Sequence, residues 1–133
     1  AIPNSQGQAI IGVGELLTGK YVGRKNPVFE ITDLFVQGDE IVFRGTVIDA
    51  STGLPVANAT VELTVTGPEG HLFIAGPSDN DGLVEANWET KKPKGNRPGT
   101  PTGLYTAMVT NVTGDGYTWD GEMQLATFTI DPS

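Results

Sequence analysis

The sequence predicts an all-β fold, an antiparallel sandwich of about seven strands, on the basis of three observations. Apolar and polar residues alternate with a period of two in several short segments, as in strands that have one buried face. Turn-favouring glycine, proline, asparagine and aspartate residues separate these segments at intervals of about 8–12 residues. The 18 glycines and 9 prolines disfavour helix interiors, and no segment combines a helical pattern with start and stop signals.

The predicted strands follow one another from residue 28 to residue 131. The segment 59–66 shows the clearest alternation, and we expect its apolar residues to face the core. Trp88 shares a face with Val84 and Ala86, so its ring is also expected in the core. The predicted strands are 28–37, 40–49, 59–66, 71–75, 83–90, 104–112 and 122–131.

The chain of 133 residues has the length of a single domain. We assign residues 28–133 to the sandwich and residues 1–27 to an N-terminal linker or an additional edge strand, because the latter segment is rich in glycine, lysine and arginine. The chain has no initiator methionine and no secretory signal, which favours a processed or excised piece of a longer protein.

Composition and charge exclude several function classes. Sixteen acidic residues against eight lysines and arginines give a formal charge of −8, which argues against nucleic-acid binding. The absence of cysteine removes disulfides, thiolate catalysis and cysteine-ligated zinc. No apolar run is long enough for a transmembrane helix, so membrane insertion is not expected.

Three segments together resemble bacterial immunoglobulin-like and carboxypeptidase-regulatory-like (prealbumin-like) domains. Segment 45–63 is similar to their first strand pair, 79–88 to their acidic turn and the strand after it, and 102–109 to their Gly-x-Tyr strand. The resemblance spans about residues 40–130 and implies an immunoglobulin-like sandwich, usually a non-catalytic part of a secreted or surface protein. It implies no catalytic residue. In such a fold Tyr105 is expected to be a corner tyrosine whose hydroxyl group holds a loop.

The acidic turn at Asp79, Asn80 and Asp81 is a candidate calcium site. These residues offer hard oxygen ligands, and calcium takes six to eight of them. The segment begins like an EF-hand loop, but its twelfth position is Thr90 rather than glutamate. The same residues favour turns through local hydrogen bonds, so a plain turn is the alternative. No other cofactor is expected.

The loop 114–121 is a candidate ligand-binding site, because Tyr117 and Trp119 lie between glycines near the tip of the predicted sandwich. Their rings could stack on sugars or anchor a partner protein. The alternative is that Trp119 folds back over the edge of the core.

Two further features have competing interpretations. His71, the only histidine, is expected to be an exposed residue at the end of a strand rather than a catalytic base. The loop 91–101 holds four of the eight cationic residues and is expected to be a solvated, irregular loop. Its alternative role is docking to an acidic neighbour or to an anionic polysaccharide.

From these observations we expect a non-enzymatic structural or accessory module of a secreted or cell-surface multidomain protein. Its partners would be neighbouring domains of the same polypeptide. The alternative is an adhesion module that binds carbohydrate or a surface protein through loop 114–121, with calcium stabilisation as a further option.

Overall fold

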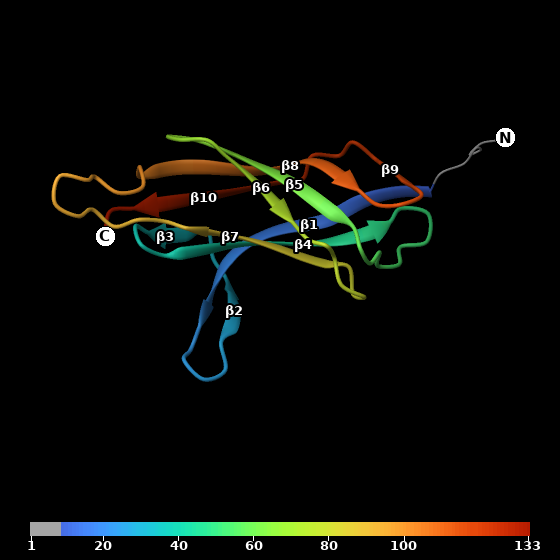
Figure 1. The fold of residues 1–133 in the computed structure, drawn as a ribbon, viewed down its shortest axis with the longest axis horizontal. Helices are drawn as coiled ribbons and strands as arrows, with labels where there is room; N and C mark the ends of the chain where they lie inside the picture. Colours follow the sequence, from blue (N-terminus) through green and yellow to red (C-terminus); the bar gives the residue numbers. More distant parts are fainter. Residues whose placement is uncertain (1–8) are drawn as a thin grey trace.

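The computed structural model describes residues 9–133, which form two packed β-sheets (Figure 1). The predicted all-β sandwich is confirmed. Among these residues, no helix is long and apolar enough to cross a membrane. The first sheet has the order β2-β1-β4-β7, with β9 also paired to β1, and the second has the order β3-β10-β8-β5-β6.

The strands of the first sheet include the longest strand of the structure. They are β1 (Ala9–Val22), β2 (Val28–Ile31), β4 (Glu40–Asp49), β7 (Leu83–Glu89) and β9 (Tyr117–Trp119). The strands of the second sheet are β3 (Leu34–Val36), β5 (Thr60–Thr66), β6 (His71–Ala75), β8 (Gly103–Thr113) and β10 (Leu125–Asp131).

The described residues contain ten strands rather than about seven, partly because the predicted strand 28–37 divides between the two sheets. Strand β2 pairs with β1 in the first sheet, whereas β3 pairs in parallel with β10 in the second. The chain crosses between the sheets at Thr32, whose amide donates to the carbonyl of Thr18 at 3.1 Å. The Thr18 hydroxyl in turn donates to the carbonyl of Thr32 at 2.7 Å. These two bonds hold the crossing point against β1.

Residues 9–22, which the sequence assigns to a linker or an added edge strand, form strand β1. Residues 1–8 of that segment lie outside the described residues. β1 pairs antiparallel with β4, and the short strands β2 and β9 pair with its two ends. Its Ile11, Val13 and Leu16 side chains are buried in the core. The register shifts between Val13 and Leu16, which is the mark of a β-bulge.

The end of β1 and the whole of β2 form a hairpin that projects from the body of the sandwich (Figure 1). Arg44 holds its base to the outer face of the first sheet, because it donates to Glu85 at 2.7 Å and to the Tyr21 hydroxyl at 2.8 Å. Its guanidinium also lies 4.0 Å from the ring centroid of Phe29. The pKa of Tyr21 is raised, mainly by its hydrogen bond to Glu85 and to a smaller extent by partial burial.

The core between the sheets is built from the inward positions that the alternation predicts. Trp88 is 7% exposed, which confirms its predicted place in the core. Phe128 lies at the centre of an aromatic cluster and contacts four other rings. The apolar residues of segment 59–66 are all buried: Ala59, Val61, Leu63 and Val65.

Tyr105 is a corner tyrosine, as the sequence predicts. Its ring is fully buried, and its hydroxyl donates to the carbonyl of Pro101, four residues upstream, at 2.7 Å. Burial, with a smaller contribution from the charge of Glu69, raises the pKa of Tyr105 above its ordinary value of 10.0. The corner therefore fixes the point at which the long loop before β8 returns to the sheet.

Replacing Tyr105 with phenylalanine is expected to lower the free energy of unfolding by about 1–2 kcal/mol, because the Pro101 carbonyl loses its partner. The wild-type protein should also lose stability at alkaline pH. The loss begins above pH 10.0, the ordinary pKa that Tyr105 has in the unfolded chain, and continues towards its higher pKa in the folded state. The Tyr105→Phe variant should lack this part of the loss of stability at alkaline pH. Urea unfolding between neutral and alkaline pH measures both effects, and Tyr117→Phe, whose hydroxyl lies 3.5 Å from Asp49, is the matched control. Equal stability of wild type and Tyr105→Phe at neutral pH would contradict the corner assignment.

Candidate ligand-binding site

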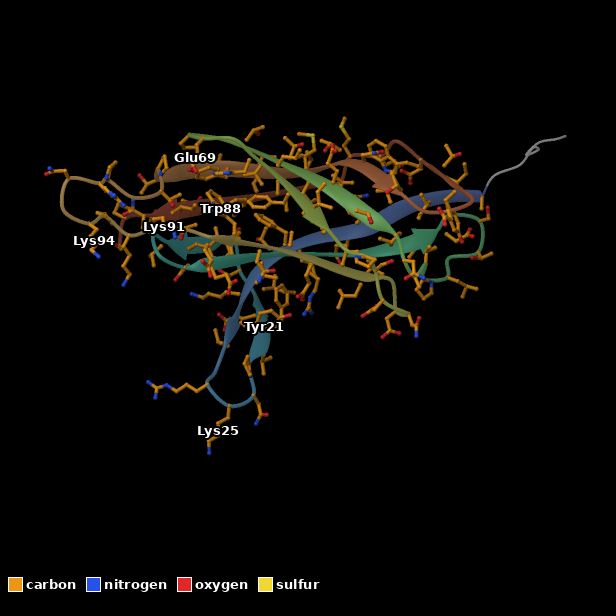
Figure 2. The ribbon with its side chains drawn as sticks, viewed as in Figure 1. Tyr21, Lys25, Glu69, Trp88, Lys91 and Lys94 are labelled. Carbon is orange, nitrogen blue, oxygen red and sulfur yellow. The ribbon has the colours of Figure 1, made fainter. Side chains whose placement is uncertain are left out.

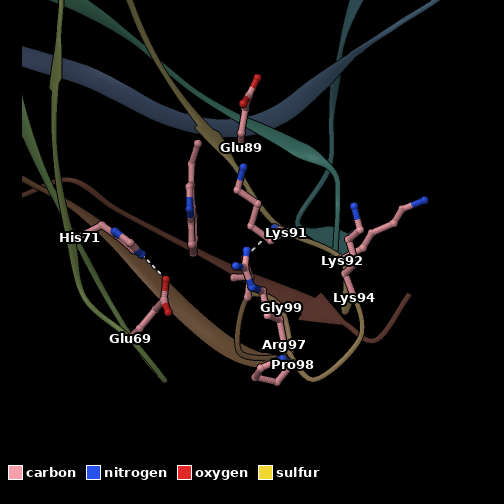
Figure 3. Close-up of a pocket in the computed structure, with 11 residues that line it drawn as sticks. Glu69, His71, Glu89, Lys91, Lys92, Lys94, Arg97, Pro98 and Gly99 are labelled. Carbon is pink, nitrogen blue, oxygen red and sulfur yellow. Dashed lines mark hydrogen bonds and ion pairs between the residues drawn. The ribbon is translucent and has the colours of Figure 1, made fainter.

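A cavity of about 560 Å³ opens where β7 leads into the loop before β8 (Figure 3). This volume lies within the usual range of small-molecule sites, about 300–1,000 Å³. The end of β7 supplies Trp88 and Glu89, and the β5–β6 connection and the start of β6 supply Glu69 and His71. The remaining lining residues belong to the loop between β7 and β8: Lys91, Lys92, Lys94, Arg97, Pro98, Gly99 and Thr100.

The loop that carries the cations is closed by its own hydrogen bonds. Lys94 and Arg97 form a tight turn in which each amide donates to the carbonyl of the other, at 3.0 and 2.9 Å. Further back, the Thr100 amide donates to the Lys91 carbonyl at 3.1 Å, and the Lys91 amide donates to the Thr100 hydroxyl at 2.7 Å. The backbone of residues 91–100 therefore has a hairpin-like shape, whereas the sequence predicts an irregular loop.

Two buried polar residues anchor this loop to the sandwich. Thr100 is 6% exposed and Gln37 is 5% exposed. The Gln37 side-chain amide donates to the Thr100 carbonyl at 2.7 Å and to the Pro98 carbonyl at 3.2 Å. Sequence reasoning misses this anchor because Gln37 and Thr100 are 63 positions apart and neither residue type signals the contact.

Aromatic rings form one wall of the cavity. The His71 ring lies 4.6 Å from the Trp88 ring, centroid to centroid, and 5.7 Å from Phe73. The Nε2 atom of His71 is paired with the Glu69 carboxylate, as the dashed line in Figure 3 shows. The sequence predicts an exposed histidine, whereas the structure holds the His71 side chain partly buried against Trp88.

The lysines and arginines of the whole chain occupy only four places: Lys20, the hairpin tip, Arg44 and this loop. Lys20 pairs with Asp39 and Arg44 pairs with Glu85. Within residues 9–133, the four loop cations form no ion pair, and Figure 2 shows Lys91 and Lys94 at the loop end of the sandwich. Four cations against the two carboxylates of Glu69 and Glu89 give the cavity a positive balance in a chain of charge −8. It can therefore bind an anionic group beside an aromatic wall.

The structure places Tyr117 and Trp119 away from this cavity, in β9 beside the first residues of β1. Both rings are half-buried and pack against the core. The Trp119 Nε1 atom is buried and, in the described part of the chain, has no hydrogen-bond partner. Packing against the core accounts for both rings, and their role in ligand binding stays a prediction.

The acidic turn at Asp79, Asn80 and Asp81 is held by hydrogen bonds of its own. Asp79 Oδ1 accepts from the amides of Asp81 and Leu83, both at 2.9 Å. The Gly82 amide donates to the Asp79 carbonyl at 2.9 Å. Among residues 9–133, no three or more histidine, cysteine, aspartate or glutamate side chains gather so that they could hold a metal ion, and calcium binding at this turn stays a prediction.

The cavity combines residues that sequence reasoning treats separately. Trp88 is expected only as a core residue, His71 as a strand-end residue and the loop as a solvated segment. The one signal that points to the site is the concentration of four cations directly after Trp88, in an otherwise acidic chain. Comparison of the chain with protein-family models and with curated proteins finds no match.

Proposed function

We propose that this chain is a non-catalytic accessory module of a longer secreted or cell-surface protein. Its resemblance to bacterial immunoglobulin-like and carboxypeptidase-regulatory-like domains supports this role. The path of the chain supports it as well, because β1 begins at one end of the long axis and the C-terminal residues lie at the other (Figure 1). Within a longer protein, a module of this shape would join its neighbours end to end.

The module's binding function is assigned to the cavity beside Trp88, and its ligand is an anionic carbohydrate. The observation that carries this proposal is the placement of Lys91 and Arg97 beside an aromatic wall in an acidic protein, with Lys92 and Lys94 on the outer side of the same loop (Figure 3). Arginine and lysine donate charge-assisted hydrogen bonds to carboxylate or sulfate groups. The His71 and Trp88 rings that line the cavity provide apolar surface against which a sugar ring can pack. A spacer that binds nothing is the alternative.

Titration with an oligogalacturonate, followed by isothermal calorimetry, tests the proposal. We expect binding that weakens with added salt, because it depends on exposed charges. The double variant Lys91→Gln/Arg97→Gln should weaken binding by roughly tenfold or more, since a hydrogen bond to a charged group contributes about 1.5–3 kcal/mol. An uncharged oligosaccharide of the same length should bind more weakly than the oligogalacturonate.

The matched control is Arg24→Gln/Lys25→Gln at the tip of the projecting hairpin, where Figure 2 shows Lys25 far from the cavity. It changes the net charge by the same amount and should leave the affinity unchanged. Equal losses in the two double variants would show that only net charge matters. No binding by wild type, or wild-type affinity in Lys91→Gln/Arg97→Gln, would refute the carbohydrate site and favour the spacer.

A further inference from the structure

The outer face of the second sheet is unusually apolar for an acidic protein. On each of its five strands the inward residues are buried or half-buried, so the alternate residues point to solvent. Six of these outward residues are aliphatic side chains with exposed fractions of 42–63%. They are Leu34, Val36, Leu72, Ile74, Leu104 and Leu125.

These side chains lie in rows that run across the strands. Leu72 is opposite Thr64, which is opposite Met108, which in turn is opposite Leu125. The neighbouring row consists of Thr66, Thr106 and Thr127. A continuous surface of methyl, methylene and hydroxyl groups therefore extends from β6 to β10. On an ordinary protein surface, exposed leucines are scattered singly, and a continuous apolar surface is less common.

Charge distribution distinguishes this face from the outer face of the first sheet. Among the described strand residues, it presents only Glu62 and Asp131 as charged side chains, and Glu62 already accepts a hydrogen bond from Thr110 at 2.8 Å. On the first sheet, strands β4 and β7 alone present four charges, those of Glu40, Arg44, Glu85 and Glu89. The sixteen acidic residues of the chain are therefore mostly placed elsewhere.

We propose that this face binds a second copy of the chain, so that two sandwiches pack through their second sheets. This inference does not depend on the carbohydrate site. Two molecules of charge −8 repel each other, and a face whose strands present only two charged side chains is one through which they can approach with less repulsion. A twofold axis places the same patch on both sides, as the commonest homodimers do.

The size of the face is close to what such a dimer needs. Five strands about 4.8 Å apart, with about seven residues each at about 3.4 Å, cover roughly 570 Å² in projection. Side-chain relief makes the accessible area larger than the projection. The accessible area of the face therefore approaches the approximately 800 Å² that each partner buries in a standard interface.

Sedimentation velocity of the full chain tests this proposal at concentrations from about 10 μM to about 1 mM. We expect a concentration-dependent dimer in the wild type. The double variant Leu104→Lys/Leu125→Lys should weaken the dimer by roughly 100-fold or more, because it places four lysines in a closed apolar interface. Leu104 and Leu125 are 63% and 58% exposed, so the fold of the monomer should tolerate both changes, and a thermal melt checks this.

The control is Thr46→Lys/Asn87→Lys, which adds two lysines at exposed positions on the outer face of the first sheet. It should dimerise like the wild type. A wild type that stays monomeric up to about 1 mM would overturn the proposal and leave a neighbouring domain as the occupant of the face. An undiminished dimer in Leu104→Lys/Leu125→Lys would overturn it as well, because the contact would then lie elsewhere, for example along the open edge of β6.

Discussion

Replacing Phe128 with alanine is expected to lower the free energy of unfolding by about 3–5 kcal/mol. Phe128 is 1% exposed and lies where the two sheets meet. Its ring stacks on Tyr105 at 5.5 Å and meets Phe43 edge-on at 5.6 Å. Phe35 and Trp88 complete its surroundings, at 5.9 and 6.4 Å. Alanine would leave a cavity among four large side chains that cannot all move inward, so most of the loss would remain after relaxation.

Urea unfolding followed by tryptophan fluorescence measures this loss. Phe128→Leu should be milder, about 1–2 kcal/mol, because it retains most of the buried volume. Met123→Ala, at a residue that is 55% exposed outside the strands, should change stability by less than about 0.5 kcal/mol. If Phe128→Ala were no more damaging than Met123→Ala, the aromatic cluster would not be the centre of the core.

Replacing Gly82 with alanine is expected to cost about 2–4 kcal/mol, for two separable reasons. Gly82 has φ +78°, in the left-handed region that an L side chain adopts only with strain. A Cβ atom at this position would also lie 2.5 Å from the Val47 carbonyl oxygen and 3.1 Å from Pro55 Cβ. The Gly82 carbonyl accepts from the Val47 amide at 2.7 Å, so the backbone cannot move away without loss of this bond.

Gly53→Ala separates the two contributions. Gly53 has φ +74°, but a Cβ atom there would meet nothing within 4 Å. Its substitution should therefore cost only about 1–2 kcal/mol, the conformational part. Chemical denaturation of both variants gives the comparison. Equal losses at the two glycines would mean that the close approach of Gly82 to Val47 adds nothing.

The fold was predictable from the sequence where local pattern and tertiary packing agree. Strand β5 alternates without interruption, because one of its faces packs on the core and the other meets solvent. Strands β4 and β6 begin and end at their predicted residues for the same reason. The division of 28–37 was not predictable, since both halves have strand composition. The crossing at Thr32 depends on bonds to Thr18, which is 14 positions away.

The candidate site was less predictable than the fold, because it is assembled from separate parts of the chain. Trp88 and the loop cations are neighbours in sequence, and their proximity is visible there. The shape of the loop depends on Gln37, whose amide reaches across from the β3–β4 connection. For Tyr117 and Trp119, by contrast, the local sequence pattern differs from the environment that the structure shows. Aromatic residues between glycines suggest an exposed tip, but parallel pairing with β1 lays both rings against the core.

The hydrogen bonds that close the cationic loop have a consequence for binding thermodynamics. A flexible loop must lose conformational entropy when it takes up a ligand, and this loss is subtracted from the affinity. Here the bonds of Thr100 to Lys91 and to Gln37, and the Tyr105 corner that follows, hold the backbone in place before any ligand arrives. Only the lysine and arginine side chains remain to be ordered. The loop is therefore preorganised, and its net affinity should retain most of the free energy of the new contacts.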